Sequence, residues 1–178
     1  MVEVSALYLD LGDELRDAAQ RRAAYEEGAR VAERALELEP TAQAHYLYAA
    51  NLGSAAQMTG VMASAWRIQE IKSHVKQALA LNPKHAPALH MMGMMLEELP
   101  WVLGGDAAAA LAYLRRAVAA DPGYEHARLD LAKAYLKRGD ATAARQELRV
   151  LVENSAGPAP VTPSRHAQEA RQLLDSLP

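Results

Sequence analysis

The residues with the greatest chemical potential in this sequence are six histidines and a cluster of methionines, because imidazole and thioether groups bind transition metals. The methionine cluster reads His90-Met91-Met92-Gly93-Met94-Met95. On a helix, Met91 and Met95 share one face, as do His90 and Met94, an arrangement that could bind a soft metal such as copper. Methionines more often fill gaps in a hydrophobic core, and Gly93 favours close helix packing. We therefore expect core packing at this cluster.

The histidines give no spacing that is typical of a zinc site. They are His45, His74, His85, His90, His126 and His166. Neither the HExxH motif nor the His-x₃-His spacing, which places two imidazoles on one helical face, occurs among them. The spacing leaves open a zinc site assembled from separate helices, but we expect no metal and no cofactor.

No other residues form a catalytic pattern. Adjacent carboxylates occur at Asp13-Glu14, Glu26-Glu27 and Glu97-Glu98, and we interpret them as solvated helix surface. The sequence has no GxSxG, P-loop or GxGxxG motif. It has no cysteine, which excludes disulfides, thiol nucleophiles and thiolate metal sites. We therefore expect a protein that is not an enzyme.

The composition predicts an all-α fold. Of the 178 residues, 51% are hydrophobic, alanine is frequent, phenylalanine is absent, and proline and glycine gather between apolar runs. The net charge is −3 and no long run of Lys or Arg occurs, so nucleic acid is not expected as a partner. No segment approaches the roughly 18 consecutive apolar residues that a membrane helix needs, so membrane insertion is not expected either.

The N-terminal residues do not resemble a secretory leader. Residues 1–15 are acidic and lack a basic segment followed by an apolar one. We therefore expect a cytoplasmic protein. The alternative is a periplasmic protein from which an export leader has been removed.

Residues 127–151 contain the clearest structural pattern, which predicts two helices joined by a tight turn at Gly139-Asp140. Small residues such as Ala132 let the two helices approach closely, and Tyr135 fills the space between them. The small and large positions are held by Leu131, Ala132, Tyr135, Gly139, Ala144, Leu148 and Leu151. This pattern resembles the 34-residue tetratricopeptide (TPR) repeat, a helix pair that stacks into a right-handed superhelix.

The rest of the chain repeats the pattern, which predicts a single TPR-like domain over residues 1–178. Tyr48, Ala49 and Leu52 in one unit, and Met92, Gly93 and Leu96 in the next, hold positions equivalent to those of the clearest repeat. Residues 1–12 are ambiguous between a short helix and an extended arm. We expect a leading helix in 13–40 with Asp13 as its N-cap, units at 41–83, 84–122 and 123–156, a proline-rich connector at 157–163, and a capping helix at 164–177.

Two of the units are longer than a standard repeat. Pro40, Pro83 and Pro122 end successive units and lie 43 and 39 residues apart, against 34 in a TPR. The alignment places the extra residues within 53–66 and 98–103, between the two helices of each unit. These insertions emerge on one edge of a solenoid.

Three segments carry a more specific resemblance. They are Ala32–Pro40 (AERALELEP), Tyr46–Gly53 (YLYAANLG) and Leu99–Asp106 (LPWVLGGD). Together with the unit lengths, they resemble the T-component of TRAP-type transporters and the related regulator of microtubule dynamics family. The resemblance implies a non-catalytic scaffold that binds a protein or peptide in a concave groove. As an alternative, it implies a transport-accessory protein that binds a solute-binding protein or a small apolar ligand.

The first helix of each unit lines the groove of a TPR superhelix, which identifies the expected partner-binding positions. They are Tyr46, Ala50, His90, Met94, Glu97, His126, Leu129, Lys133 and Lys137. Tyr46, His90 and Met94 could form an adaptable apolar pocket. Lys133 and Lys137 are one helical turn apart and could meet a carboxylate of the partner. The alternative is that all of these are ordinary solvated or packing residues.

The inserted turns contain large apolar residues. Trp101 and Leu103 lie in one insertion, and Trp66 lies in the other. We expect Trp101 and Leu103 to pack against neighbouring helices. If these residues are exposed instead, they mark an edge contact for a partner or for self-association, and a homo-oligomer is possible on that basis.

Overall fold

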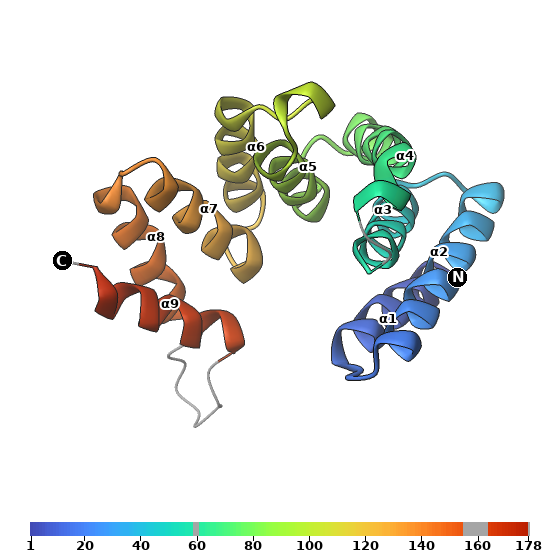
Figure 1. Cartoon of the computed structure of the whole chain (residues 1–178), viewed down its shortest axis with the longest axis horizontal. Coiled ribbons are helices and arrows are strands. Elements are labelled where there is room, and N and C mark those ends of the chain that lie inside the picture. The colour runs from blue at the N-terminus through green and yellow to red at the C-terminus, as the bar shows by residue number, and fades with distance from the viewer. Residues whose placement is uncertain (59–60, 155–163, 178) are drawn as a thin grey trace. The chain divides into compact units, whose positions relative to one another are not determined.

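The computed structural model in Figure 1 describes the backbone of residues 1–58, 61–154 and 164–177, with their side chains except those of 61–66. Within these residues all regular structure is helical, as the composition predicted. The chain divides into two compact units, Met1–Met91 (unit 1) and Met92–Pro178 (unit 2). The boundary between the two units falls within one helix.

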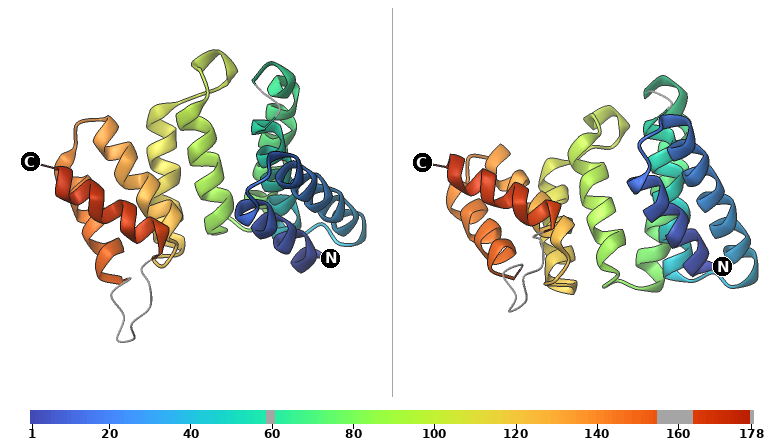
Figure 2. Two further views of the ribbon diagram at one scale, coloured as in Figure 1. Left: turned by 60° about the horizontal axis from the view of Figure 1, so that its bottom comes forward. Right: turned by 90° about the horizontal axis from the view of Figure 1, so that it is seen from below.

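The helices follow one another with short connections. They are α1 (Val2–Glu14), α2 (Ala18–Leu38), α3 (Ala42–Gln57), α4 (Val61–Leu81), α5 (Ala86–Glu98), the 3₁₀ turn η1 (Trp101–Leu103), α6 (Ala107–Ala120), α7 (Glu125–Lys137), α8 (Ala141–Asn154) and α9 (Arg165–Ser176). Pro40, Pro83 and Pro122 each follow the end of a helix, as predicted. In unit 1, each helix from α1 to α4 packs against the next, and in unit 2 each helix from α6 to α9 packs against the next, as the views in Figure 2 show.

The predicted leading helix is two helices, and the prediction that Asp13 caps it was wrong. Residues 2–14 already form α1, and Leu15 then adopts extended backbone angles. Asp17 is the true N-cap of α2, because its carboxylate accepts a hydrogen bond of 2.9 Å from the backbone N–H of Gln20. The carboxylate of Asp13 instead accepts a hydrogen bond of 2.7 Å from the hydroxyl of Tyr25, which joins α1 to α2.

Unit 1 joins three helices through a buried polar network. The hydroxyl of Ser5 on α1 donates to the carbonyl of Gly28 on α2 (2.8 Å). The side-chain amide of Asn51 on α3 donates to the carbonyl of Leu47 (3.0 Å) and to the hydroxyl of Ser5 (3.2 Å). Both Ser5 and Asn51 are fully buried. A Cβ on residue 28 would lie 2.2 Å from Oδ1 of Asn51, so only glycine at this position leaves room for the side chain of Asn51.

Unit 2 has a core of apolar side chains between α6, α7, α8 and α9. One cluster surrounds Tyr135, which packs with Leu114, Leu131 and Ala144. The hydroxyl of Tyr135 accepts a hydrogen bond of 2.7 Å from Nε of Arg115 on α6. This is the space-filling role that the sequence predicted for the tyrosine of the clearest repeat.

The turns of unit 2 follow local sequence signals. Gly139 has a φ of 78°, a left-handed conformation that favours glycine, and it ends α7. Asp140 then caps α8 by accepting a hydrogen bond of 3.0 Å from the N–H of Ala143. Asp106 caps α6 in the same way, as predicted, through the N–H groups of Ala108 and Ala109. Local chemistry therefore fixes these helix ends.

None of the helices in the described part of the chain is both long and apolar enough to cross a membrane. The predicted connector 157–163 and the side chain of Trp66 lie outside the described residues.

Candidate partner-binding cleft

Four of the predicted groove residues line one cleft in unit 2, with a volume of about 100 Å³. Met94 and Glu97 come from α5, and Lys133 and Lys137 come from α7. The complete lining is Met94, Glu97, Glu98, Asp130, Lys133, Ala134 and Lys137. Residues of α5 and α7 that are 32 or more positions apart in the sequence therefore meet here, as expected if the first helices of successive TPR units lie side by side.

Glu97 is the electrostatic centre of this cleft. Its side chain is only 6% exposed, and it binds two cations: Nζ of Lys137 at 3.0 Å and Nη2 of Arg138 at 2.6 Å. Burial by itself would raise the pKa of Glu97, but the hydrogen bonds from Arg138 and Lys137 outweigh it and hold the pKa below its ordinary value. Glu97 is thus a fixed anion that joins α5 to the end of α7.

Arg138 is a member of this site that the sequence analysis missed. It also donates a hydrogen bond of 2.7 Å to the carbonyl of Ala134, one turn earlier on α7. A basic residue at the C-terminal end of a helix commonly binds the last carbonyls, so its position before Gly139 was an available signal. Its pairing with Glu97, 41 residues away, had no local signal.

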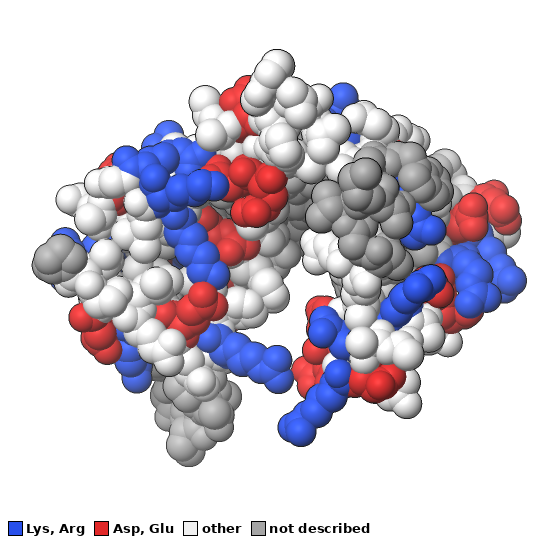
Figure 3. Space-filling model, viewed as in Figure 1, with Lys and Arg blue, Asp and Glu red and all other residues white. Residues whose placement is uncertain are grey.

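The two lysines already have carboxylate partners within unit 2. Lys133 lies 2.8 Å from Glu169 of α9 and 3.7 Å from Asp130 of its own helix. Lys137 pairs with Glu97, yet its side chain stays 64% exposed, and that of Lys133 stays 43% exposed. Figure 3 shows Lys and Arg side chains next to Asp and Glu side chains over α7. A partner carboxylate would therefore compete with internal ones.

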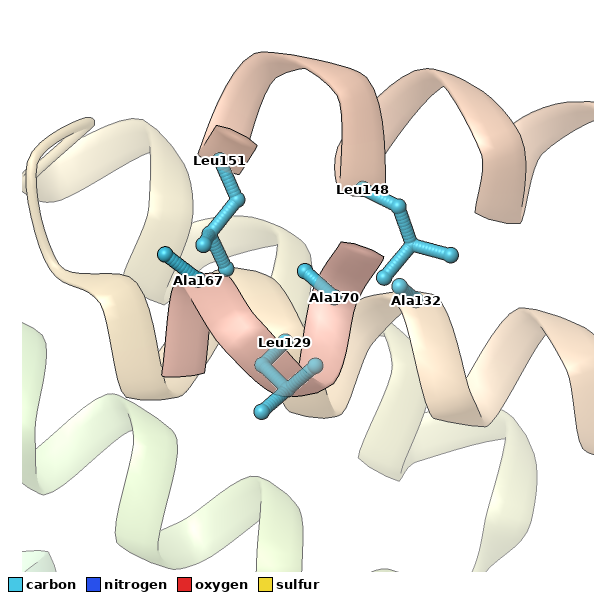
Figure 4. Close-up of a cluster of buried hydrophobic side chains, with 6 residues drawn as sticks. All are labelled: Leu129, Ala132, Leu148, Leu151, Ala167 and Ala170. Carbon is cyan, nitrogen blue, oxygen red and sulfur yellow. The ribbon is translucent and has the colours of Figure 1, made fainter. Parts of the chain in front are cut away.

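Leu129 was wrongly predicted to be an exposed groove residue. It is 2% exposed and lies in a cluster with Leu148 and Leu151 of α8 and with Ala167 and Ala170 of α9, as Figure 4 shows. The reason is that α9 packs against both α7 and α8 and covers this face. The same packing gives α9 the covering position expected of a capping helix, with Ser164 as its N-cap.

The other predicted groove residues lie outside this cleft. Tyr46 and Ala50 on α3 are half-buried in unit 1, and the ring of Tyr46 lies 5.3 Å from that of His85. His90 is half-buried and also belongs to unit 1, so a pocket of Tyr46, His90 and Met94 stays a prediction. His126 is exposed, and its ring lies 3.8 Å from that of His166 on α9.

Unit 1 contains a histidine pair that the sequence spacing did not reveal. Nδ1 of His45 on α3 and Nδ1 of His74 on α4 are 3.0 Å apart, so one ring donates a hydrogen bond to the other. Burial lowers the pKa of both, and of His85. Beside this pair, the hydroxyl of Tyr48 donates to Glu70 at 2.7 Å; burial and this bond raise the pKa of Tyr48. Among the described residues, no three His, Cys, Asp or Glu side chains are arranged to hold a metal ion.

The expectation that Trp101 packs against neighbouring helices was also wrong. Trp101 is 83% exposed and Val102 is 64% exposed, whereas Leu103 is half-buried. These residues form η1, which lies at the outer end of the α5–α6 connection in Figure 1. The helical insertion therefore presents an indole to solvent.

These features define the chain as a TPR-like helical protein, a class whose general role is that of a scaffold for interaction. A tetratricopeptide repeat family matches residues 103–160. A second family, described as regulator of microtubule dynamics protein 1-3, matches residues 1–98, which is more than half of the chain. The chain belongs to this regulator of microtubule dynamics family.

Curated relatives and solved structures agree with this assignment. Regulator of microtubule dynamics protein 1 of Mus musculus is 32% identical over 164 residues, covering 82% of this chain and 53% of the relative. The protein of the same name from Bos taurus is 37% identical over 123 residues, covering 60% of this chain and 39% of the relative. The chain thus spans about half the length, or less, of these relatives.

Two crystal structures show the same fold. A tetratricopeptide repeat protein from Parabacteroides merdae has a TM-score of 0.52 at 18% identity, covering 98% of this chain and 57% of that chain. The MamA protein has a TM-score of 0.52 at 18% identity, covering 92% of this chain and 100% of that chain. At this level of identity the similarity concerns the fold alone.

Proposed function

We propose that this protein is a non-catalytic TPR scaffold that binds an extended protein segment on the face of unit 2 formed by α5 and α7. The observation that carries the proposal is the meeting of Met94, Glu97, Lys133 and Lys137 at one cleft. Rigid helices preorganise such a face, which lowers the entropic cost of binding.

The chemistry of the cleft suits a segment with a carboxylate and a neighbouring apolar side chain. Lys133 and Lys137 keep much of their surface exposed while Glu97 and Glu169 hold their ammonium groups in place. A partner carboxylate can approach the exposed side of either lysine. Met94 packs against the Tyr135 cluster and is only partly buried, so it offers an adaptable apolar contact.

A peptide selection tests this proposal. Peptides would be selected from a random display library against the whole chain, and their affinities measured by fluorescence anisotropy. The double variant Lys133→Ala/Lys137→Ala should bind the selected peptides about fivefold more weakly, since each exposed ion pair contributes up to about 1 kcal/mol. The matched control is Lys72→Ala/Lys76→Ala, two lysines at the same spacing on α4. Equal losses in both double variants would place the binding site elsewhere.

The name of the relatives suggests one protein partner to test directly. Regulators of microtubule dynamics are named for an effect on microtubules, and co-sedimentation of this chain with polymerised tubulin would detect binding. We expect any such binding to weaken in Lys133→Ala/Lys137→Ala. The alternative function, a carrier for an apolar ligand, is less favoured because five of the seven residues that line the unit 2 cleft are charged.

A further inference from the structure

The outer face of α1 carries a row of exposed apolar side chains. Val4, Leu7 and Leu11 are 45%, 65% and 46% exposed. Their spacing of three and four residues places them on one face of the helix. The opposite face is anchored by Ser5 and Gly12, which are buried against α2 and α3. The exposed row therefore lies on a helix that is packed against two other helices of unit 1.

An open apolar cleft continues this row toward α2. It has a volume of about 440 Å³ and is lined by Tyr8, Leu11, Leu15, Gln20, Ala23 and Ala24. Two of these six side chains carry a polar group, the amide of Gln20 and the hydroxyl of Tyr8, and the other four are apolar. The row and the cleft together form a continuous surface, which we call the α1 surface, that suits the apolar face of a helix.

Charge flanks the α1 surface on one side. Glu3, Asp10 and Glu14 are exposed and are spaced seven and four residues apart, so they share a helical face adjacent to the apolar row. Helix α1 carries no Lys or Arg. An amphipathic partner helix with cations on the matching side would gain charge contacts along with apolar burial.

Two other occupants fit this charge pattern less well. In an antiparallel pairing of two copies of α1, the acidic flank of one copy would lie against the acidic flank of the other, and like charges repel. An anionic lipid surface would be repelled by the same three carboxylates. The pattern instead favours a partner of opposite charge.

We propose that the α1 surface docks a basic amphipathic helix of a partner protein, with its leucine-like residues over Val4, Leu7 and Leu11 and its lysines or arginines beside Glu3, Asp10 and Glu14. This surface is separate from the cleft between α5 and α7. The two proposals therefore concern different residues and can be tested separately.

A designed probe tests this proposal. The probe is an alanine-rich helical peptide of 13 residues, the length of α1, with leucines at i, i+3 and i+7 and lysines along one flank. A second peptide has glutamates in place of the lysines. By fluorescence anisotropy with the whole chain, the lysine peptide should bind about tenfold more tightly than the glutamate peptide, because three exposed charge pairs contribute roughly 0.5 kcal/mol each.

Two variants separate charge from apolar contact. Leu7→Glu should weaken the lysine peptide at least about tenfold, because a leucine loses its burial. Glu3→Lys/Asp10→Lys/Glu14→Lys should reverse the preference, so that the glutamate peptide binds more tightly. The control variant Trp101→Ala/Val102→Ala removes the exposed apolar residues of η1 and should leave both affinities unchanged. Circular dichroism verifies that each variant remains folded.

Several results would overturn the proposal. These are equal binding of both peptides, an unchanged affinity in Leu7→Glu, or a loss of binding in Trp101→Ala/Val102→Ala that matches the loss in Leu7→Glu. Light scattering that shows a dimer of the chain, converted to a monomer by Leu7→Glu, would assign the surface to a second copy instead. Tighter binding to phosphatidylserine vesicles than to the lysine peptide would assign it to a membrane.

Discussion

Both units of this chain bury apolar side chains between their helices, but they differ in the polar groups that accompany them. Among the described residues, unit 1 buries the uncharged polar residues Ser5, His45, Asn51 and His85, whereas unit 2 buries Arg128 and the ion-paired side chain of Glu97. Unit 1 joins α1, α2 and α3 through hydrogen bonds between buried groups. Unit 2 has leucine clusters at its centre and ion pairs around them, such as Arg128–Glu147 at 2.5 Å between α7 and α8.

The same helix-pair pattern can therefore be stabilised in two ways. Apolar clusters tolerate small changes in position, because dispersion and burial are not directional. Buried hydrogen bonds require fixed geometry, and a buried polar group that loses its partner is costly. Unit 1, which also buries apolar side chains such as Tyr25, Leu47 and Val75, should therefore be sensitive to lost volume as unit 2 is, and in addition to changes at its buried hydrogen bonds and to protonation of its buried histidines.

The largest expected effect is in the core of unit 2. Leu148 is fully buried between α7, α8 and α9, so Leu148→Ala should lower the free energy of unfolding by about 3 kcal/mol through lost burial and a cavity. Urea denaturation measures the loss, and hydrogen exchange should locate it in residues 92–154. The matched control Leu81→Ala, at a leucine that is 56% exposed, should change stability by less than about 0.5 kcal/mol. Comparable losses in the two variants would contradict the leucine core.

The second effect tests added volume in unit 1. Gly28→Ala would place a methyl group 2.2 Å from Oδ1 of Asn51, so we expect a loss of about 2 kcal/mol even though alanine favours helix. Gly53→Ala is the control in the same unit, because its methyl group would lie 3.4 Å from Cε of Met91. Thermal denaturation should show Gly53→Ala to be neutral or slightly stabilised. A stable Gly28→Ala would show that Asn51 can move.

The third effect concerns the ion pairs of unit 2. Glu97→Gln removes the charge that binds Arg138 and Lys137, so we expect a loss of about 1.5 kcal/mol at neutral pH. The folded pKa of Glu97 lies below its ordinary value of 4.5, so its contribution is present above that pH and is lost as the pH falls through the folded pKa. The variant and the wild type should therefore converge in stability in acid. A difference that persists below the folded pKa would mean that packing, and not charge, is responsible.

Much of this architecture could be predicted from local sequence. The prolines at 40, 83 and 122, the Asp106 cap and the Gly139 turn are recognisable because each acts through its own backbone or its nearest neighbours. The α1–α2 break was missed because Asp13 and Asp17 are equally good caps by type. What distinguishes them is the bond from Tyr25 to Asp13, a contact between helices.

The residues that line the candidate cleft could be predicted from the sequence, but the ion pairs that their side chains form could not. TPR spacing placed Met94, Glu97, Lys133 and Lys137 at equivalent positions of successive first helices, and these four line one cleft. The pairing of Lys133 with Glu169 depends on how α9 packs. No pattern along the sequence contains that information. Leu129 was misassigned for the same reason, since α9 covers it.

The smallest expected effect is a pH dependence that is specific to unit 1. The folded pKa values of His45, His74 and His85 lie below the ordinary value of 6.5 because of burial, so the unfolded chain binds more protons than the folded chain just below that pH. Stability from these groups is complete above pH 6.5 and decreases as the pH falls toward the folded pKa values. We expect a loss of roughly 1 kcal/mol by pH 5.5.

The His45–His74 hydrogen bond makes this dependence testable by one substitution. A pair of imidazoles 3.0 Å apart cannot both carry a proton on the facing nitrogens, so protonation of both rings must break the hydrogen bond between His45 and His74. His74→Gln keeps a polar side chain that does not titrate, so the urea-denaturation midpoint should change less between pH 7.5 and 5.5 than it does in the wild type, and the remaining change comes from His45 and His85. His90→Gln, at a half-buried histidine on α5, is the control and should retain the wild-type slope. If the midpoint of His74→Gln changes with pH as much as that of the wild type, other groups take up the protons. The polar contacts of unit 1 would then be insensitive to acid at the His45–His74 pair.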